Sequence, residues 1–385
     1  MIHITHIITG LYVGGAENML SKLLTQFSNK DIKCSVISLL PLGPLAFQIK
    51  SLNIPVYSLN MNRSHIQSFS SLFMLGRLLN HLKPDIIQTW MYHADLIGGI
   101  AAKLFLKNTP VVWNIRHNVI EKGVDKKSTH FVSKICGLLS SYLPELIICC
   151  SNSSIINHQK YGYNISKLMI IPNGFNIDKF KFDESIRTSI RNSMGITEKE
   201  IVIGMVARFH PHKDHRNFIN ACSILIKHLP ILRIILIGDN VSPKNVELNN
   251  LLLENRLHDK TFLLGRRDDV ANYLSAFDIG VLSSSGEAFP NVLGEMMACE
   301  LPCVTTDVGD TKEIIGDCGL VVPSKDPLKL ANAILQLALK SSISRRELGK
   351  KSRQRIFKFY NIETISNKYL SLYYNVLEKY KTRLK

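Results

Sequence analysis

Two glutamates and two basic residues in the second half of the chain carry side chains suited to binding a polar ligand. Glu287 and Glu295 flank the segment Ala-Phe-Pro-Asn-Val-Leu-Gly, and Arg208 and Lys213 belong to Ala-Arg-Phe-His-Pro-His-Lys. Arginine presents a planar fork of donors and lysine a point charge, so the pair could neutralise a diphosphate. Carboxylates accept hydrogen bonds from hydroxyl groups, so one glutamate could hold a ribose and the other a second sugar ring. Together these groups suit a nucleotide-activated sugar.

The position of Pro290 predicts how the glutamate segment is built. The apolar run Ile279–Leu282 predicts a strand, and proline is well suited to the first position of the helix that follows. Glu287 then lies in the loop at the carboxyl end of the strand, where open α/β sheets bind ligands, and Glu295 lies roughly 7 Å along the helix axis. The helix start offers backbone N–H groups to a phosphate, those of Asn291, Val292 and Leu293. Taken alone, the glutamates are also compatible with a solvated helix edge.

Arg208 and Lys213 strengthen the ligand-binding interpretation because of where their strand ends. The run Ile201–Ala207 predicts a strand that brings Arg208 to the same sheet edge, with Lys213 in the loop beyond it. Gly238 ends a further predicted strand of that sheet. Alone, the two basic residues are compatible with ordinary surface charge. Their position beside the glutamate segment favours a phosphate site.

The first half of the chain offers weaker candidates. Gly14 and Gly15 lie between the first predicted strand and the first predicted helix, with a spacing that differs from the dinucleotide-binding fingerprint. A Gly-Gly turn could still bring backbone close to a diphosphate or an acceptor. His117 follows the predicted strand Val111–Ile115 and could donate to a sugar hydroxyl or a leaving phosphate, and His93 is a second candidate at another strand end. A lone histidine is more often structural, so both interpretations stay open.

Short apolar runs alternate with longer helical patterns, which is typical of βαβ units and parallel sheets. In the first half the predicted strands are Ile2–Thr9, Lys33–Leu39, Ile54–Ser58, Ile86–Thr89, Val111–Ile115 and Leu146–Cys150, and the helices are Ala16–Phe27, Ile66–Leu82 and Ala94–Leu106. In the second half the predicted strands are Ile201–Ala207, Ile234–Ile237, Thr261–Leu264, Ile279–Leu282 and Cys303–Thr305.

The same alternation predicts the division of the chain. We expect two Rossmann-like, doubly wound domains at residues 1–180 and 181–361, with a cleft between them. The polar stretch Asp178–Glu200 has the composition of a connection between domains. A last amphipathic segment, Ile362–Tyr380, predicts a helix within residues 362–385 that packs back on the first domain.

Composition limits the classes of protein that the chain can belong to. The formal net charge is +16 over 385 residues, which favours acidic partners such as phosphates, anionic lipid or nucleic acid. No apolar stretch is long enough to span a membrane, and no secretory signal is apparent. The eight cysteines form no regular framework, which favours reduced thiols in the cytoplasm. No Asp-x-Asp sequence and no metal-ligand spacing occurs, so no bound metal is expected.

Basic residues beside apolar helical patterns raise the possibility of a membrane surface. Arg63, Arg77 and Lys83 accompany one such pattern, and a second is accompanied by Lys122, Lys126, Lys127 and Lys134. Basic amphipathic stretches can lie on anionic lipid, although helices that pack on a sheet with a solvated basic rim give the same pattern. Nucleic acid is not expected, because no binding motif or stacking platform accompanies the charge.

An ordered set of motifs resembles the retaining glycosyltransferases of family 4, which have the two-domain GT-B fold. The resemblance covers nearly the whole chain and is strongest between Ile201 and Pro323. Its motifs are Ala207-Arg-Phe with Lys213, Leu236-Ile-Gly-Asp, Phe262-Leu-Leu-Gly, Glu287 with Glu295, Gly319-Leu-Val-Val-Pro, Gly14-Gly-Ala-Glu and Arg116-His-Asn.

The resemblance implies a role for each candidate. Arg208 and Lys213 would hold the diphosphate, Glu295 the ribose hydroxyls and Glu287 the donor sugar. From the other domain, His117 would contact the sugar and Gly14-Gly15 would lie beside the diphosphate. The family implies retention at the anomeric carbon, no metal and no other cofactor. One departure is Asp310, which stands where a second glycine is commoner and puts a backbone turn in question.

From these features we expect a metal-independent hexosyltransferase of polysaccharide, capsule or lipopolysaccharide biosynthesis. It would move a hexose or N-acetylhexosamine from a nucleotide sugar, which we expect to be UDP-linked, to a glycan or a polyprenyl-linked or other lipid-linked glycan. We expect a cytoplasmic protein, and a peripheral position on the inner face of the membrane stays open. Two alternatives stay open: a nucleotide-sugar epimerase of the same fold, and a non-catalytic module that binds anionic lipid or nucleic acid.

Overall fold

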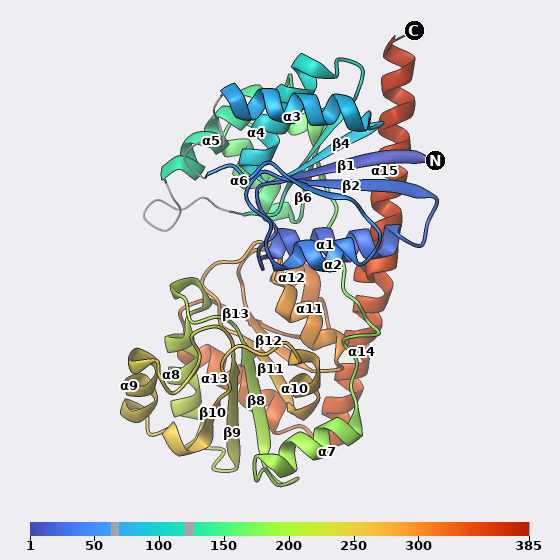
Figure 1. The fold of residues 1–385 in the computed structure, drawn as a ribbon. Coiled ribbons are helices and arrows are strands. Elements are labelled where there is room, and N and C mark those ends of the chain that lie inside the picture. Colours follow the sequence, from blue (N-terminus) through green and yellow to red (C-terminus); the bar gives the residue numbers. More distant parts are fainter. Residues whose placement is uncertain (63–68, 119–126, 385) are drawn as a thin grey trace. The chain divides into compact units, whose positions relative to one another are not determined.

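The structure is a computed structural model that describes residues 1–62, 69–118 and 127–384, and it divides into two compact units. The first unit contains Met1–Gly174 together with Ile362–Lys385, and the second contains Phe175–Asn361 (Figure 1). The sequence places the boundary at residue 180, whereas the units divide at Gly174, inside the Pro-Asn-Gly-Phe turn. Arg63, Lys122 and Lys126 lie outside the described residues.

The first unit is built on a seven-stranded parallel sheet in the order β3-β2-β1-β4-β5-β6-β7. Its strands are β1 (Ile2–Ile8), β2 (Ile32–Ser38), β3 (Val56–Ser58), β4 (Ile86–Trp90), β5 (Val111–Ile115), β6 (Leu146–Cys149) and β7 (Leu168–Ile170). The order of strands reverses between β1 and β4. The six predicted strands are confirmed, and β7, a short half-buried strand at the sheet edge, was not predicted.

Helices cover both faces of this sheet because successive strand residues point to opposite sides. Ile4 and Ile8 of β1 pack in a core with α1, α2 and α15, whereas Ile7 packs in a second core with α3, α4 and α5. Helices α1 and α2 thus lie on the opposite side of the sheet from α3 (Figure 1). The helices of this unit are α1 (Gly15–Phe27), α2 (Pro44–Lys50), α3 (Phe69–Leu82), α4 (Tyr92–Phe105), α5 (Lys127–Leu139), α6 (Asn152–Lys160) and α15 (Ile362–Leu384), with a 3-10 turn, η1 (Ile165–Lys167).

The second unit is built on a six-stranded parallel sheet in the order β10-β9-β8-β11-β12-β13, which reverses between β8 and β11. Its strands are β8 (Ile201–Val206), β9 (Leu232–Ile237), β10 (Thr261–Leu263), β11 (Ile279–Leu282), β12 (Cys303–Thr306) and β13 (Gly319–Val322). Its helices are α7 (Glu184–Ser193), α8 (His215–Leu225), α9 (Val246–Glu254), α10 (Val270–Ala276), α11 (Asn291–Ala298), α12 (Thr311–Ile315), α13 (Pro327–Ala338) and α14 (Ser342–Tyr360), with 3-10 turns η2 (Pro211–Lys213) and η3 (His258–Lys260).

The prediction that Asp178–Glu200 connects two domains is wrong, because the whole stretch belongs to the second unit. Helix α7 lies within this stretch, and two of its arginines are buried. Arg187 and Arg191 both pair with the carboxylate of Asp278, at 2.7 and 3.1 Å. The charged composition therefore reflects internal ion pairs rather than a solvated linker.

The expected C-terminal helix is present as α15, and it belongs to the first unit. Its Ile365, Tyr369 and Tyr373 side chains are buried in the core with α1 and α2. The hydroxyl of Tyr373 donates to the side chain of Gln88 in β4. The chain thus completes its first sheet unit with its last helix.

Candidate functional site

The second sheet reverses its strand order at β8 and β11, and the predicted ligand-binding residues follow these two strands. Ile203 of β8 is the register partner of Ile279 of β11, so the two strands are direct neighbours. Arg208 comes after β8, and Glu287 comes after β11. The carboxyl ends of parallel strands at such a reversal form the usual binding crevice of an open α/β sheet.

Lys213 and Glu287 form an ion pair across this reversal. Their side chains are 23% and 10% exposed, so the pair is only partly accessible to water. The fully buried Ser284 donates its hydroxyl to the same carboxylate oxygen of Glu287 at 2.7 Å. Ser284 was not predicted, since its role depends on a contact that only the folded loop creates. Two residues that were assigned separate roles are thus electrostatically coupled.

The loop that carries Lys213 is fixed to the loop after β11 by backbone contacts. The hydroxyl of Ser283 lies 3.0 Å from the carbonyl oxygen of Lys213 and 3.1 Å from that of Asp214, so it donates to this turn. The N–H of Ser285 donates to the carbonyl of His212 at 2.8 Å. Asp214 has a left-handed backbone (φ 48°) and caps α8 by accepting from Asn217 N. Lys213 is therefore held at a defined position.

Arg208 is exposed at the same edge, and among the described residues its guanidinium makes no hydrogen bond or ion pair. His210 and His212 accompany it with ring centroids 5.2 Å apart. Burial lowers the pKa of His210, and the nearby charges of Arg208, His212 and Lys213 lower it further. The two histidines were not singled out from the sequence, although they lie in the same motif. The loop is an electropositive site suited to an anion.

Gly238 is required by the close approach of two backbones. A Cβ atom at this position would lie 2.0 Å from the carbonyl oxygen of Ala207. The N–H of Phe209 donates to the carbonyl of Asp239 at 2.8 Å, which joins the ends of β8 and β9. Gly238 therefore shapes the edge on which Arg208 stands.

Helix α11 begins one residue later than the sequence predicts, with Pro290 as its N-cap residue. Of the three backbone groups predicted to meet a phosphate, the N–H of Leu293 donates to the carbonyl of Pro290 at 3.2 Å. Asn291 and Val292 occupy the first turn, where backbone N–H groups face a ligand. Glu295 lies one turn further along and is partly exposed.

The loop after β12 supports the backbone of Glu287. Gly309 has φ +57°, and a Cβ there would lie 2.4 Å from the carbonyl oxygen of Glu287. The N–H of Asp310 donates to the carbonyl of Ala288 at 3.2 Å. Asp310 itself has φ −96°, so this position needs no second glycine. The departure noted in the sequence is therefore compatible with the turn.

Phe289, in the loop between Glu287 and α11, is buried within the second unit. Its ring stacks on Phe175 with centroids 6.1 Å apart and an interplanar angle of 20°. Its second neighbour is Tyr360, at 5.8 Å. The side chain of Phe289 thus packs in the interior and anchors the loop between Glu287 and α11.

The candidates of the first unit lie at the corresponding edge of its own sheet. Gly14 is the N-cap of α1 and Gly15 its first residue, and a Cβ built on Gly15 would have no atom within 4 Å. His93 follows β4, so it shares the strand reversal with the glycines, and burial lowers its pKa. His117 follows β5, the next strand, and its ring lies edge-on to Tyr92 at 6.2 Å. Position therefore favours His93 as much as His117.

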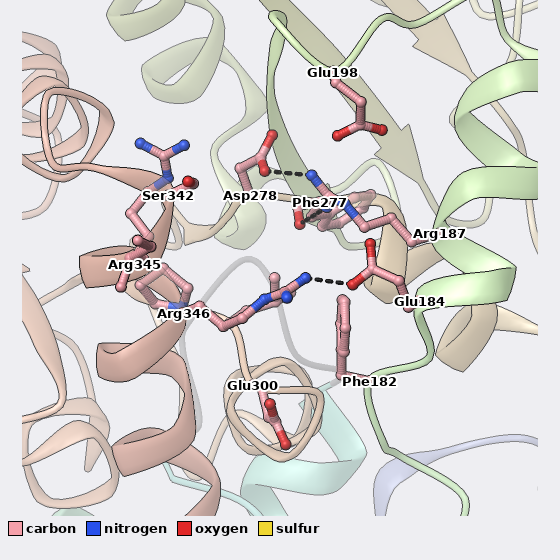
Figure 2. Close-up of a pocket in the computed structure, with 13 residues that line it drawn as sticks. Phe182, Glu184, Arg187, Glu198, Phe277, Asp278, Glu300, Ser342, Arg345 and Arg346 are labelled. Carbon is pink, nitrogen blue, oxygen red and sulfur yellow. Dashed lines mark hydrogen bonds and ion pairs between the residues drawn. The ribbon is translucent and has the colours of Figure 1, made fainter.

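A hollow of about 260 Å³ lies at the opposite edge of the second sheet, where Asp278 precedes β11 and Pro302 precedes β12 (Figure 2). Its lining charges are largely paired with one another, Arg187 with Asp278 and Arg346 with Glu184. It contains none of the predicted ligand-binding residues. The site at the strand reversal, rather than this hollow, has charge available for a ligand.

Within the described ranges, no group of three or more His, Cys, Asp and Glu side chains is arranged to hold a metal ion. No helix in the described part of the chain is long and apolar enough to cross a membrane.

Comparison with known proteins covers both halves of the chain. A family model described as Glycosyltransferase Family 4 matches residues 13–179, and one described as Glycosyl transferases group 1 matches residues 200–340. A UDP-Gal:alpha-D-GlcNAc-diphosphoundecaprenol alpha-1,3-galactosyltransferase of Escherichia coli is 25% identical over 84% of this chain and 83% of its own length.

Two further proteins resemble nearly the whole chain. An N,N'-diacetylbacillosaminyl-diphospho-undecaprenol alpha-1,3-N-acetylgalactosaminyltransferase of Campylobacter jejuni is 26% identical over 91% of this chain and 93% of its own length. The crystal structure of HepE from Anabaena in complex with UDP superposes with a TM-score of 0.84 at 20% identity, covering 96% of this chain and 99% of HepE, and so shows the shared fold. The chain belongs to the family 4 glycosyltransferases of the GT-B fold and is a glycosyltransferase.

Proposed function

We propose that the protein transfers a hexose or N-acetylhexosamine from a UDP-sugar to a polyprenyl-diphosphate-linked glycan, with retention at the anomeric carbon. The observation that carries this proposal is the cluster of Arg208, Lys213 and Glu287 at the strand reversal of the second sheet. Relatives that cover most of the chain act on diphosphoundecaprenol-linked sugars according to their names. The product would be an intermediate of surface polysaccharide synthesis.

In this proposal the electropositive loop stabilises the leaving diphosphate. Breaking the sugar–phosphate bond develops negative charge on the diphosphate, and fixed donors aimed at that charge lower the barrier. Arg208 and Lys213 would supply two of these donors, and the N–H groups of Asn291 and Val292 a further contribution. When the diphosphate binds, it would share Lys213 with Glu287, which leaves the glutamate beside the donor sugar. Glu295 would accept from the ribose hydroxyls.

The remaining roles are proposals that rest on position. No metal is assigned, because the arginine, the lysine and the helix start supply the positive potential. Gly15 has open space above it, so we propose that it admits the diphosphate or the acceptor. His117 is proposed to contact the sugar, with His93 as a second candidate. Variants H117A and H93A decide between the two histidines: the variant that loses transfer activity but keeps its affinity for UDP identifies the residue that contacts the sugar.

We further propose that the protein works in the cytoplasm, bound to the inner face of the membrane through α3–α5 of the first unit. Large apolar side chains are exposed on α5 and just after it: Phe131 and Leu138 of the helix are 63% and 76% exposed, and Tyr142 is 74% exposed. Exposed basic residues on α3–α5 are Arg77, Lys103, Lys127 and Lys134. An apolar surface among lysines and arginines fits anionic lipid.

Flotation with phosphatidylglycerol vesicles tests this surface. The double variant F131S/L138S should bind less, while Leu253→Ser, an exposed leucine of α9 in the second unit, serves as the matched control. Equal binding by both variants would refute the assignment.

Calorimetry with UDP tests the donor site. Arg208→Ala removes a charged donor worth about 1.5–3 kcal/mol, so UDP should bind roughly 10- to 150-fold more weakly. Exposed Arg256, which follows α9, provides the control variant R256A. Unchanged UDP affinity in R208A would contradict the phosphate assignment. Product analysis with a panel of UDP-sugars separates transfer, which forms a glycosidic bond, from epimerisation, which returns a free nucleotide sugar.

A further inference from the structure

The chain passes between the two units twice, at Gly174–Phe175 and at Asn361–Ile362, and the two crossovers lie side by side. Within the first unit, a Cβ on Gly174 would lie 2.8 Å from the Cα of Ile362. Within the second unit, Phe175 donates its N–H to the carbonyl of Tyr360 at 2.8 Å and forms a parallel bridge with Asn361. The crossovers therefore behave as one paired segment.

On the side of the second unit, this pair is packed against the candidate donor loop. The ring of Phe175 stacks on Phe289, which lies between Glu287 and Asn291, and Tyr360 packs on the same ring. Helix α11 contacts the Phe175 ring at Gly294, where a Cβ atom would lie 2.2 Å from the ring. Close packing of this kind transmits small displacements, because a protein interior has few voids and low compressibility.

On the side of the first unit, the crossover is held by the residue next to His117. Arg116 donates to the carbonyl of Ile171 at 3.0 Å and to the side chain of Asn173 at 2.9 Å, both just before the crossover. Its guanidinium also lies 5.8 Å from the ring centroid of Tyr369, on the helix that follows the second crossover. One side chain thus contacts both chain segments.

We propose that the paired crossover is a positioning element that couples the donor loop to the loop of His117. Phe175 and Tyr360 position Glu287 and the start of α11. Arg116 positions His117. Ligand binding at the donor loop would alter packing on Phe289, and the crossover would carry this change to Arg116. The inference rests on the proposed function in taking a UDP-sugar as the donor-site ligand.

Hydrogen–deuterium exchange with and without UDP tests the coupling. In the wild-type protein UDP should slow exchange at residues 286–295 and also change it at residues 114–118 and 171–175. In R116K, which keeps the positive charge but not the forked contacts, the change at 286–295 should persist and that at 114–118 should disappear. Protection confined to the second unit in the wild-type protein would overturn the proposal.

Calorimetry with UDP tests the aromatic part. Phe175→Leu should weaken UDP binding about tenfold, because a displaced loop loses its aligned contacts. Phe277→Leu is the matched control, since Phe277 is equally buried in the same unit but packs on Gly204 of β8, before β11 begins. Equal UDP affinity in the two variants at matched thermal stability would refute the role of Phe175. Tyr360→Leu replaces Phe175→Leu if the latter does not fold. Absence of UDP binding by the wild-type protein would instead refute the proposed function.

Discussion

Replacing Ser284 by alanine isolates one atom of the candidate site. The hydroxyl of Ser284 is fully buried and donates to Glu287 at 2.7 Å, while the carbonyl of Ser284 accepts independently from Thr306 Oγ1 at 2.6 Å. The S284A variant therefore removes the contact to the carboxylate and leaves the backbone contact in place. Glu287 keeps its ion pair with Lys213.

The expected cost follows from the type of hydrogen bond that is lost. A bond to a charged group contributes about 1.5–3 kcal/mol, and the second unit is in the size range where 1 kcal/mol shifts the melting temperature by about 2–4 °C. The melting temperature of S284A should therefore fall by roughly 3–12 °C. If Glu287 must keep its position in the transition state, kcat/KM for transfer should fall by roughly 10- to 150-fold.

Calorimetric unfolding and steady-state transfer kinetics measure the two effects. Ser285→Ala is the control, because its hydroxyl has contacts only at 3.5 Å and lies next to Ser284 in the same loop. S284A should differ from S285A in both measurements. If S284A matches S285A in stability and rate, the carboxylate does not depend on Ser284 and the reasoning fails.

Three further predictions concern the scaffold. Gly238→Ala should abolish folding or strongly destabilise the second unit in denaturant titration, because its Cβ would lie 2.0 Å from a backbone oxygen; a cooperative, wild-type-like transition would contradict this. Asp278→Asn should lower the free energy of unfolding by about 3–5 kcal/mol in the same titration, since two buried arginines lose their shared carboxylate. A loss below about 1 kcal/mol, the value typical of surface ion pairs, would contradict this. Burial lowers the pKa of His158 from 6.5 to about 4, so the unfolded state takes up its proton first and stability falls as pH falls from 6.5 towards 4. The loss is at most about 3 kcal/mol, and His158→Gln should flatten this pH dependence in urea titrations at each pH.

The sequence was sufficient for features that depend on local pattern. Alternating strands and helices predicted both parallel sheets, and the strand pattern placed Arg208 and Glu287 at the same edge of the second sheet. The structure adds that the strands before them, β8 and β11, are direct neighbours. The missed strands, β7 and β13, are short and lie at sheet edges, where few buried residues leave a periodic signal.

Features that depend on distant partners could not be predicted. Arg187 and Arg191 look like linker residues until Asp278, far along the chain, is brought beside them. Ser284 looks like one serine in a polar run until Glu287 folds back on it. Pro290 differs from expectation by one position, because it caps α11 instead of occupying the first helical position.

The placement of α15 has a consequence for how the protein is made. The core of the first unit contains Ile365, Tyr369 and Tyr373, which leave the ribosome after the whole second unit has been synthesised. Until then, the apolar surface around α1 and β4 that these residues cover is exposed to water. Domains usually fold in order of synthesis, but here the unit that starts first finishes last. Nascent chains that stall before Ile362 should therefore depend on chaperones, and their second unit should fold before the first is complete.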